Sequence, residues 1–85
     1  MSVTVDPARL AYEMSIRGVS ASALARKAHL SPAIVGAALA GRPIAATSLR
    51  LMAAALQAIP VDPVIETLVA PEVQARSHQR PPASR

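Results

Sequence analysis

The sequence predicts a single all-α domain, a bundle of five helices followed by a short basic tail. At 85 residues the chain has the length of one small domain, since chains divide into several domains only at much greater length. Hydrophobic residues make up 52% of it, and with one Tyr and no Phe or Trp they are almost all aliphatic. Ala and Leu favour helix over strand, and Pro and Gly divide the chain into segments of helical length.

The first helix is predicted from Pro7 to Arg17. Asp6 before a proline is a typical helix start, because its carboxylate accepts hydrogen bonds from the first free backbone N–H groups, and Gly18 ends the segment. Leu10 and Met14 share the face that is expected to point into the core. A neighbouring solvated stripe is expected to carry two successive ion pairs at i, i+4 spacing, formed by Arg9, Glu13 and Arg17.

Two shorter helices are predicted next, with a tight connection between them. Ser20 caps the first of them, which is expected to end near Ala28. Ser31, followed by a proline, opens the second, which is predicted to span Pro32 to Ala40. The expected inward positions of the first of these helices are Leu24, Ala25 and Ala28, and its expected outward positions are Arg26 and Lys27.

The chain then has room for two more helices. The fourth is expected to open at Ala46 or Thr47 and to continue until Pro60, since proline cannot donate the next helical hydrogen bond. Asp62, again before a proline, starts a fifth helix with the apolar residues Val64, Ile65, Leu68 and Val69. The remainder is polar and interrupted by proline, so residues 71–85 are predicted to be a flexible, disordered basic tail and residues 1–70 the folded domain.

Several classes of function find no support in the residues. The chain has no Cys, and its two histidines, His29 and His78, lack spaced carboxylates, so neither a metal site nor general-base catalysis is expected. The absence of a glycine-rich phosphate loop, a nucleophile elbow and paired carboxylates predicts a protein that is not an enzyme and binds no cofactor. The apolar stretches are too short for a membrane span, and the N-terminus lacks a signal-peptide pattern.

Charge is distributed unevenly along the chain. Nine basic and five acidic residues give a net charge of +4, which favours a polyanionic partner. Every acidic residue lies outside the stretch from Met14 to Val61. The charged residues inside this stretch are all basic, namely Arg17, Arg26, Lys27, Arg42 and Arg50. The middle of the chain is therefore predicted to provide a strip that contacts phosphates.

Small and aliphatic residues recur at characteristic places across the two short helices. Gly18 and Ser20 stand at the entry, Leu24 and Ala25 lie inside the first helix, and Val35 lies inside the second. This pattern is completed by Gly41, Leu49 and Leu56. It resembles the DNA-binding domain of phage repressors and Cro proteins, the XRE-like helix-turn-helix family, over roughly residues 10–68.

The resemblance implies that the second short helix is a recognition helix. Its residues facing base edges would be Pro32, Ala33 and Ala37, with Ser31 and Ile34 near the DNA backbone. The residues along the phosphates would be Arg26, Lys27, Arg42 and Arg50. The chain departs from the family pattern at two places, with Ala21 where Gln is common and His29 where the turn usually has glycine.

The predicted recognition helix contains no Arg, Gln, Asn or Lys, the residues that make bidentate contacts to bases. It offers methyl contacts to thymine and close backbone approach at Gly36, so specificity would come from flanking Arg side chains or from DNA shape. The same apolar surface would also suit another protein.

A homodimer contact is predicted from apolar residues elsewhere that a small bundle leaves uncovered. These residues are Tyr12, Ile16, Val64 and Leu68.

We therefore expect a small, dimeric, sequence-specific transcriptional regulator of repressor or Cro type that blocks a promoter by occupying its operator. Its expected partner is double-stranded DNA, and its expected location is the cytoplasm of a bacterial cell, on the nucleoid. The alternative is a helix-turn-helix fold that binds a protein, for instance as an antirepressor or accessory factor.

Overall fold

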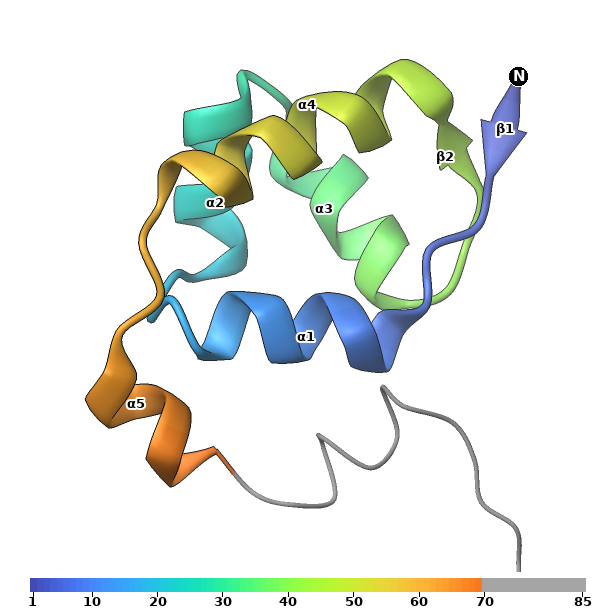
Figure 1. Ribbon diagram of the computed structural model, residues 1–85. Helices are drawn as coiled ribbons and strands as arrows, with labels where there is room; N and C mark the ends of the chain where they lie inside the picture. The colour runs from blue at the N-terminus through green and yellow to red at the C-terminus, as the bar shows by residue number, and fades with distance from the viewer. Residues whose placement is uncertain (70–85) are drawn as a thin grey trace, which may run out of the picture.

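The computed structural model describes residues 1–69, which form five helices and a short two-stranded sheet (Figure 1). The helices are α1 (Pro7–Ser15), α2 (Ala21–Ala28), α3 (Pro32–Leu39), α4 (Ala46–Ala58) and α5 (Pro63–Leu68), and the strands are β1 (Ser2–Val3) and β2 (Ile44–Ala45). The helical fold class and the five predicted segments are confirmed. The predicted basic tail, residues 71–85, lies outside the described residues.

Polar side chains start most of the helices as predicted. The carboxylates of Asp6 and Asp62 each accept two backbone N–H groups in the first turns of α1 and α5. The hydroxyl of Ser20 accepts the N–H of Ala23 at 3.1 Å and caps α2. Ser31 is the N-cap residue of α3, as its place before Pro32 predicts, but its side chain makes no capping hydrogen bond.

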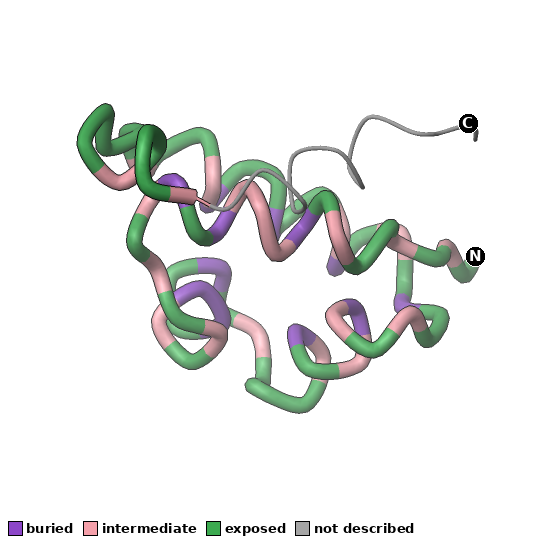
Figure 2. Tube along the Cα trace, turned by 90° about the horizontal axis from the view of Figure 1, so that it is seen from below, coloured by how far each residue is buried: buried purple, intermediate pink, exposed green. Residues whose placement is uncertain are grey.

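The core lies between α2, α3 and α4, with α1 packed beside α3. Leu24, Val35 and Met52, one from each of the three helices, are its largest fully buried side chains. Figure 2 shows that the buried positions face the interior of this small bundle. Leu56 is half-buried and packs against the edge of this core. The shared core fixes which sides of α2 and α3 face outward.

The antiparallel sheet was not predicted from the sequence. β1 pairs with β2 through Val3 opposite Ile44, and the N–H of Ala46 donates to the carbonyl of Met1 at 3.0 Å. Strands of two residues are too short to show the alternation that reveals a strand, and their pairing joins distant parts of the chain. The sheet ties the N-terminus to the start of α4 (Figure 1).

The first helix ends earlier than predicted, at Ser15 instead of Arg17. The chain turns there through Gly18, which has a φ of 64°, a conformation that glycine adopts without steric cost. Ile16, predicted to be exposed, is buried with only 4% of its surface accessible. The reason is that the chain entering α5 returns over this end of α1, where the N–H of Asp62 donates to the Ile16 carbonyl at 2.8 Å.

Arg17 does not lie on a solvated stripe as predicted. Its side chain is 14% exposed, and its Nε donates to the carbonyls of Leu56 and Ile59 at 2.8 and 3.0 Å. These carbonyls lie at the end of α4, where the Leu56 carbonyl also accepts the N–H of Ile59. Glu13 forms both predicted ion pairs, with Arg9 at 2.6 Å and with Arg17 at 2.7 Å. Arg17 therefore fastens the end of α4 to α1.

The last described helix, α5, protrudes from the bundle in Figure 1. Ile65 packs against Gly18, where a Cβ would lie 3.0 Å from the Ile65 Cδ1 atom. Val64 and Leu68 are 67% and 76% exposed, as predicted for residues that the bundle does not cover. Tyr12, expected to join them, is half-buried and lies beside the guanidinium of Arg9.

Candidate nucleic-acid interface

The connection between α2 and α3 is a tight turn of three residues, His29, Leu30 and Ser31. His29 adopts the left-handed conformation with a φ of 60° and a ψ of 39°. The N–H of Leu30 donates to the carbonyl of Ala25 at 2.8 Å, which satisfies an acceptor at the end of α2. His29 therefore occupies a backbone conformation for which glycine is usual, in agreement with its place in the family pattern.

Buried residues hold α2 and α3 against each other. The three predicted inward residues of α2, Leu24, Ala25 and Ala28, are all buried. On α3, Val35 and Ala38 have no accessible surface. Because both helices are only two turns long, these few contacts fix the orientation of each outer face.

The outer face of α3 carries only small apolar side chains and one glycine. Pro32, Ala33 and Gly36 are exposed, and Ala40 is exposed directly after the helix. Ile34 and Ala37, both predicted to be near DNA, are half-buried and pack against the core. The sequence analysis missed Ala40, although the period of 3.6 residues places it on the same face as Ala33, since seven residues make almost two turns.

Gly36 lies at the centre of this face. A Cβ built on it would have no heavy atom within 4 Å, and its φ is not in the positive region. No part of the described chain therefore packs against Gly36, and the close approach expected there, to DNA or to another protein, stays a prediction. Glycine inside a helix costs about 1 kcal/mol relative to alanine, and nothing in the described fold requires it here.

The four basic residues predicted to contact phosphates are all exposed, and they are Arg26, Lys27, Arg42 and Arg50. Within residues 1–69 both ion pairs involve Glu13, so none of these four cations is paired with an acid there. Asp6 and Asp62 use their carboxylates to cap helices. The described surface around α2 and α3 thus carries positive charge that no acidic neighbour neutralises.

Three of these cations flank α3 along the chain. Arg26 and Lys27 lie in the last turn of α2, just before the connection to α3. Arg42 follows the other end of α3, where its N–H donates to the Ala37 carbonyl at 2.9 Å. Eight helical residues span about 12 Å, so positive charge is available near both ends of this short helix. Arg50 lies on α4, which packs against α2.

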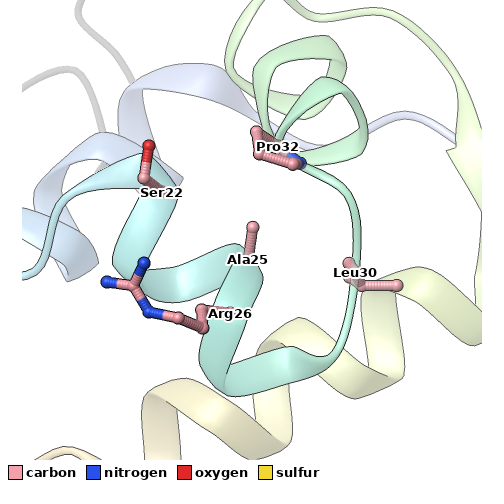
Figure 3. A pocket seen from close by; sticks show the side chains of 5 residues that line it. All are labelled: Ser22, Ala25, Arg26, Leu30 and Pro32. Carbon is pink, nitrogen blue, oxygen red and sulfur yellow. The ribbon is translucent and has the colours of Figure 1, made fainter.

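A hollow of about 400 Å³ opens between α2 and the start of α3 (Figure 3). Its lining is Ser22, Ala25, Arg26, Leu30 and Pro32. Three of the lining residues are apolar, namely Ala25, Leu30 and Pro32. The other two, Ser22 and Arg26, contribute a hydroxyl and a guanidinium from α2. The hollow was not predicted, since it depends on how the turn places Leu30 and Pro32 opposite α2.

The described residues were also compared with the requirements of a metal site and of a membrane-spanning helix. Residues 1–69 bring no three His, Asp or Glu side chains close enough together to hold a metal ion. None of the described helices has the length and apolar character that a membrane crossing requires. Comparison of the chain with known protein families, with characterised proteins and with solved structures found no match.

Proposed function

We propose that this chain is a small DNA-binding transcriptional regulator of repressor or Cro type. In this proposal α2 and α3 form a helix-turn-helix, and α3 enters the major groove of an operator. The observation that carries it is the set of four exposed cations around this helix pair, none of them paired with an acid within residues 1–69. Exposed cations beside two short packed helices suit the phosphates on either side of a groove.

The positions of the acidic residues also support DNA binding by α2 and α3. Four acidic residues lie within residues 1–69, and three of them are engaged in helix capping or ion pairs, namely Asp6, Glu13 and Asp62. The fourth, Glu66, lies on α5, away from the helix pair in sequence. A phosphate backbone approaching α2 and α3 would therefore meet cations without a competing carboxylate from the intervening chain, residues 14–61.

Two copies are expected to act together on DNA. Val64 and Leu68 expose apolar surface on α5, and such surface supports a contact between copies. In a dimer, the two recognition helices would enter successive major grooves about 34 Å apart. Occupancy of the operator would then be sufficient to block a promoter.

A second candidate function is the binding of another protein by the same helix pair, as in an antirepressor or accessory factor. The specific observation in its favour is the exposed face of α3, where Pro32, Ala33 and Gly36 provide no side-chain hydrogen-bond donor or acceptor. Base recognition usually uses such groups. Protein interfaces commonly bury apolar surface at their centre.

The proposal is tested by measuring binding to labelled 30-bp DNA duplexes between 50 and 200 mM salt, first with a random-sequence pool and then with duplexes selected from it. Four phosphate contacts per copy predict that log K falls with log salt with a slope of about −3.6 per copy. Selection should enrich a common sequence. A protein that remains unbound at 50 mM salt, while its circular dichroism shows it folded, would contradict the proposed function.

A further inference from the structure

The exposed face of α3 limits which features of DNA it can distinguish. Pro32, Ala33, Gly36 and Ala40 are exposed on it, and none has a side-chain donor or acceptor. In the major groove, base pairs differ by hydrogen-bonding groups and by the C5-methyl group of thymine. Only the methyl group can be recognised by apolar contact alone, so the chemistry of this face selects one base feature.

Gly36 allows this face to come close to its partner. The space where its Cβ would lie is open, so an approaching surface meets the bare helix backbone at this point. Ala33 and Ala40, about one turn before and after Gly36 on the same face, each carry one exposed methyl group. A groove that carries methyl groups can thus reach van der Waals contact with α3 along its middle turn.

The hollow beside α3 extends the apolar surface at its N-terminal end. Pro32 belongs both to the exposed face and to the hollow, whose floor is continued by Leu30 and Ala25 (Figure 3). The guanidinium of Arg26 and the hydroxyl of Ser22 lie on the opposite side of the hollow. This arrangement provides apolar contact next to groups that can bind a phosphate oxygen.

We propose that α3 reads DNA through the C5-methyl groups of thymine in the major groove, with the exposed Pro32, Ala33 and Ala40 as the contacting residues and Gly36 permitting close approach. The inference rests on the proposed DNA-binding function and specifies how the same site discriminates sequence. Affinity comes from the cations around α3, and preference for one base over another comes from methyl contacts. Sequences rich in thymine opposite α3 are therefore favoured.

The test uses four duplexes that differ only in this methyl group. Alternating A·T and A·U duplexes of 24 bp form one pair, and alternating G·C duplexes with cytosine or 5-methylcytosine form the other. 5-Methylcytosine places a methyl group in the major groove at the position it has in thymine, on a different base pair. Affinities of the full chain are measured at 50 mM salt.

We expect tighter binding to the methylated member of each pair, by about fourfold for every methyl group that α3 contacts, the factor for burying one CH₂-sized group. Equal affinities within both pairs would overturn methyl recognition and leave the DNA-binding proposal standing. A preference in the A·T pair alone would overturn it as well, because it would indicate a response to DNA shape. Failure to bind any of the four duplexes would contradict the proposed function and this inference with it.

A variant assigns the effect to α3. Ala33→Gly removes one exposed methyl group from the proposed contact, and we expect it to lower the ratio of the A·T to the A·U affinity. Ala54→Gly makes the same change at an exposed position of α4 and should leave the ratio at the wild-type value. Because the readout is a ratio measured on one variant, the stability cost of glycine affects both affinities alike. A wild-type ratio in Ala33→Gly would remove Ala33 from the contact.

Discussion

The two helices of the proposed helix-turn-helix have the same length, but the chemistry of their solvent-facing residues differs. Each spans eight residues and buries its inner face in the same core. α2 presents Ser22, Arg26 and Lys27 to solvent, whereas α3 presents Pro32, Ala33 and Gly36. Their starts differ too, because Ser20 caps α2 through its side chain, whereas the side chain of Ser31 makes no capping hydrogen bond at α3.

This difference indicates a division of roles between two neighbouring helices. Cations on α2 and after α3 can bind any phosphate backbone and supply affinity without regard to sequence. α3 lacks charge, so it can contribute only through the shape and apolar contacts of its surface. The core beneath both helices is shared, and the two roles therefore depend on the same packing.

The largest effect is expected from truncating a side chain in the core that α2 and α3 share. Leu24 has no accessible surface and lies in the core between α2, α3 and α4. Leu24→Ala should cost about 2–5 kcal/mol of unfolding free energy, a large part of the stability of so small a domain. Thermal and urea unfolding followed by circular dichroism measure it. Leu51→Ala, at a position 45% exposed, is the matched control and should change stability far less.

The next prediction separates the two outer faces and the two candidate functions. Gly36→Glu places a carboxylate on the exposed face of α3, where the new Cβ has no packed neighbour within 4 Å. Under the DNA proposal it should weaken binding by more than about 100-fold, because like charges across an interface cost several kcal/mol. Glu is a better helix former than Gly, so the fold should be retained.

Gly36→Gln is the control for Gly36→Glu, since it adds a side chain of similar size without charge. It should weaken DNA binding much less than Gly36→Glu, and both variants should melt no lower than the wild type. If Gly36→Glu leaves the affinity for the selected duplex unchanged, α3 does not face DNA. Lost binding to a protein partner with intact DNA affinity would favour the protein-binding alternative.

The local start and stop signals were enough to predict the five helices. Asp6 and Asp62, each before a proline, and Ser20 act within a few residues of themselves, so a short stretch of sequence contains the whole signal. The tight connection through His29, Leu30 and Ser31 was also predicted, because the two flanking helices leave few residues between them, whereas the glycine-like position of His29 was implied only by the family resemblance.

The missed features all depend on contacts between distant residues. Arg17 was placed on a solvated stripe because its spacing from Glu13 is local, whereas its bonds to Leu56 and Ile59 cross about 40 residues of sequence. Ile16 is buried for a similar reason, since the chain entering α5 returns over it. In the candidate site, the sequence predicted the exposed cations correctly, but the partial burial of Ala37 depends on how α3 packs.

A smaller effect is expected at the joint between the two helices. His29 adopts the left-handed conformation, which costs a residue with a Cβ about 1–2 kcal/mol and costs glycine little. His29→Gly should therefore raise the unfolding free energy by about 1 kcal/mol, even after the greater entropy loss of glycine on folding. Thermal melting of the two proteins at the same pH tests this. His29→Ala should not be stabilising, since it keeps the Cβ.

The smallest expected effect is that of removing one exposed cation near α3 on the salt dependence of DNA binding. Arg42 is exposed at the end of α3 and has no acidic partner within residues 1–69. If it contacts a phosphate, Arg42→Ala should lower the magnitude of the salt slope by about 1 and weaken binding to every duplex alike. The ratio between A·T and A·U duplexes should stay unchanged, because that ratio depends on α3.

The control for Arg42→Ala is Arg9→Ala, which removes the same charge from α1, outside the proposed interface. Arg9 is 47% exposed and paired with Glu13, which keeps its second partner Arg17 when Arg9 is removed. The loss of this exposed pair should cost little stability. If net charge alone governed binding, both variants would change the salt slope equally. A change confined to Arg42→Ala would show a local phosphate contact, and a slope unaltered by Arg42→Ala would place this residue outside the interface.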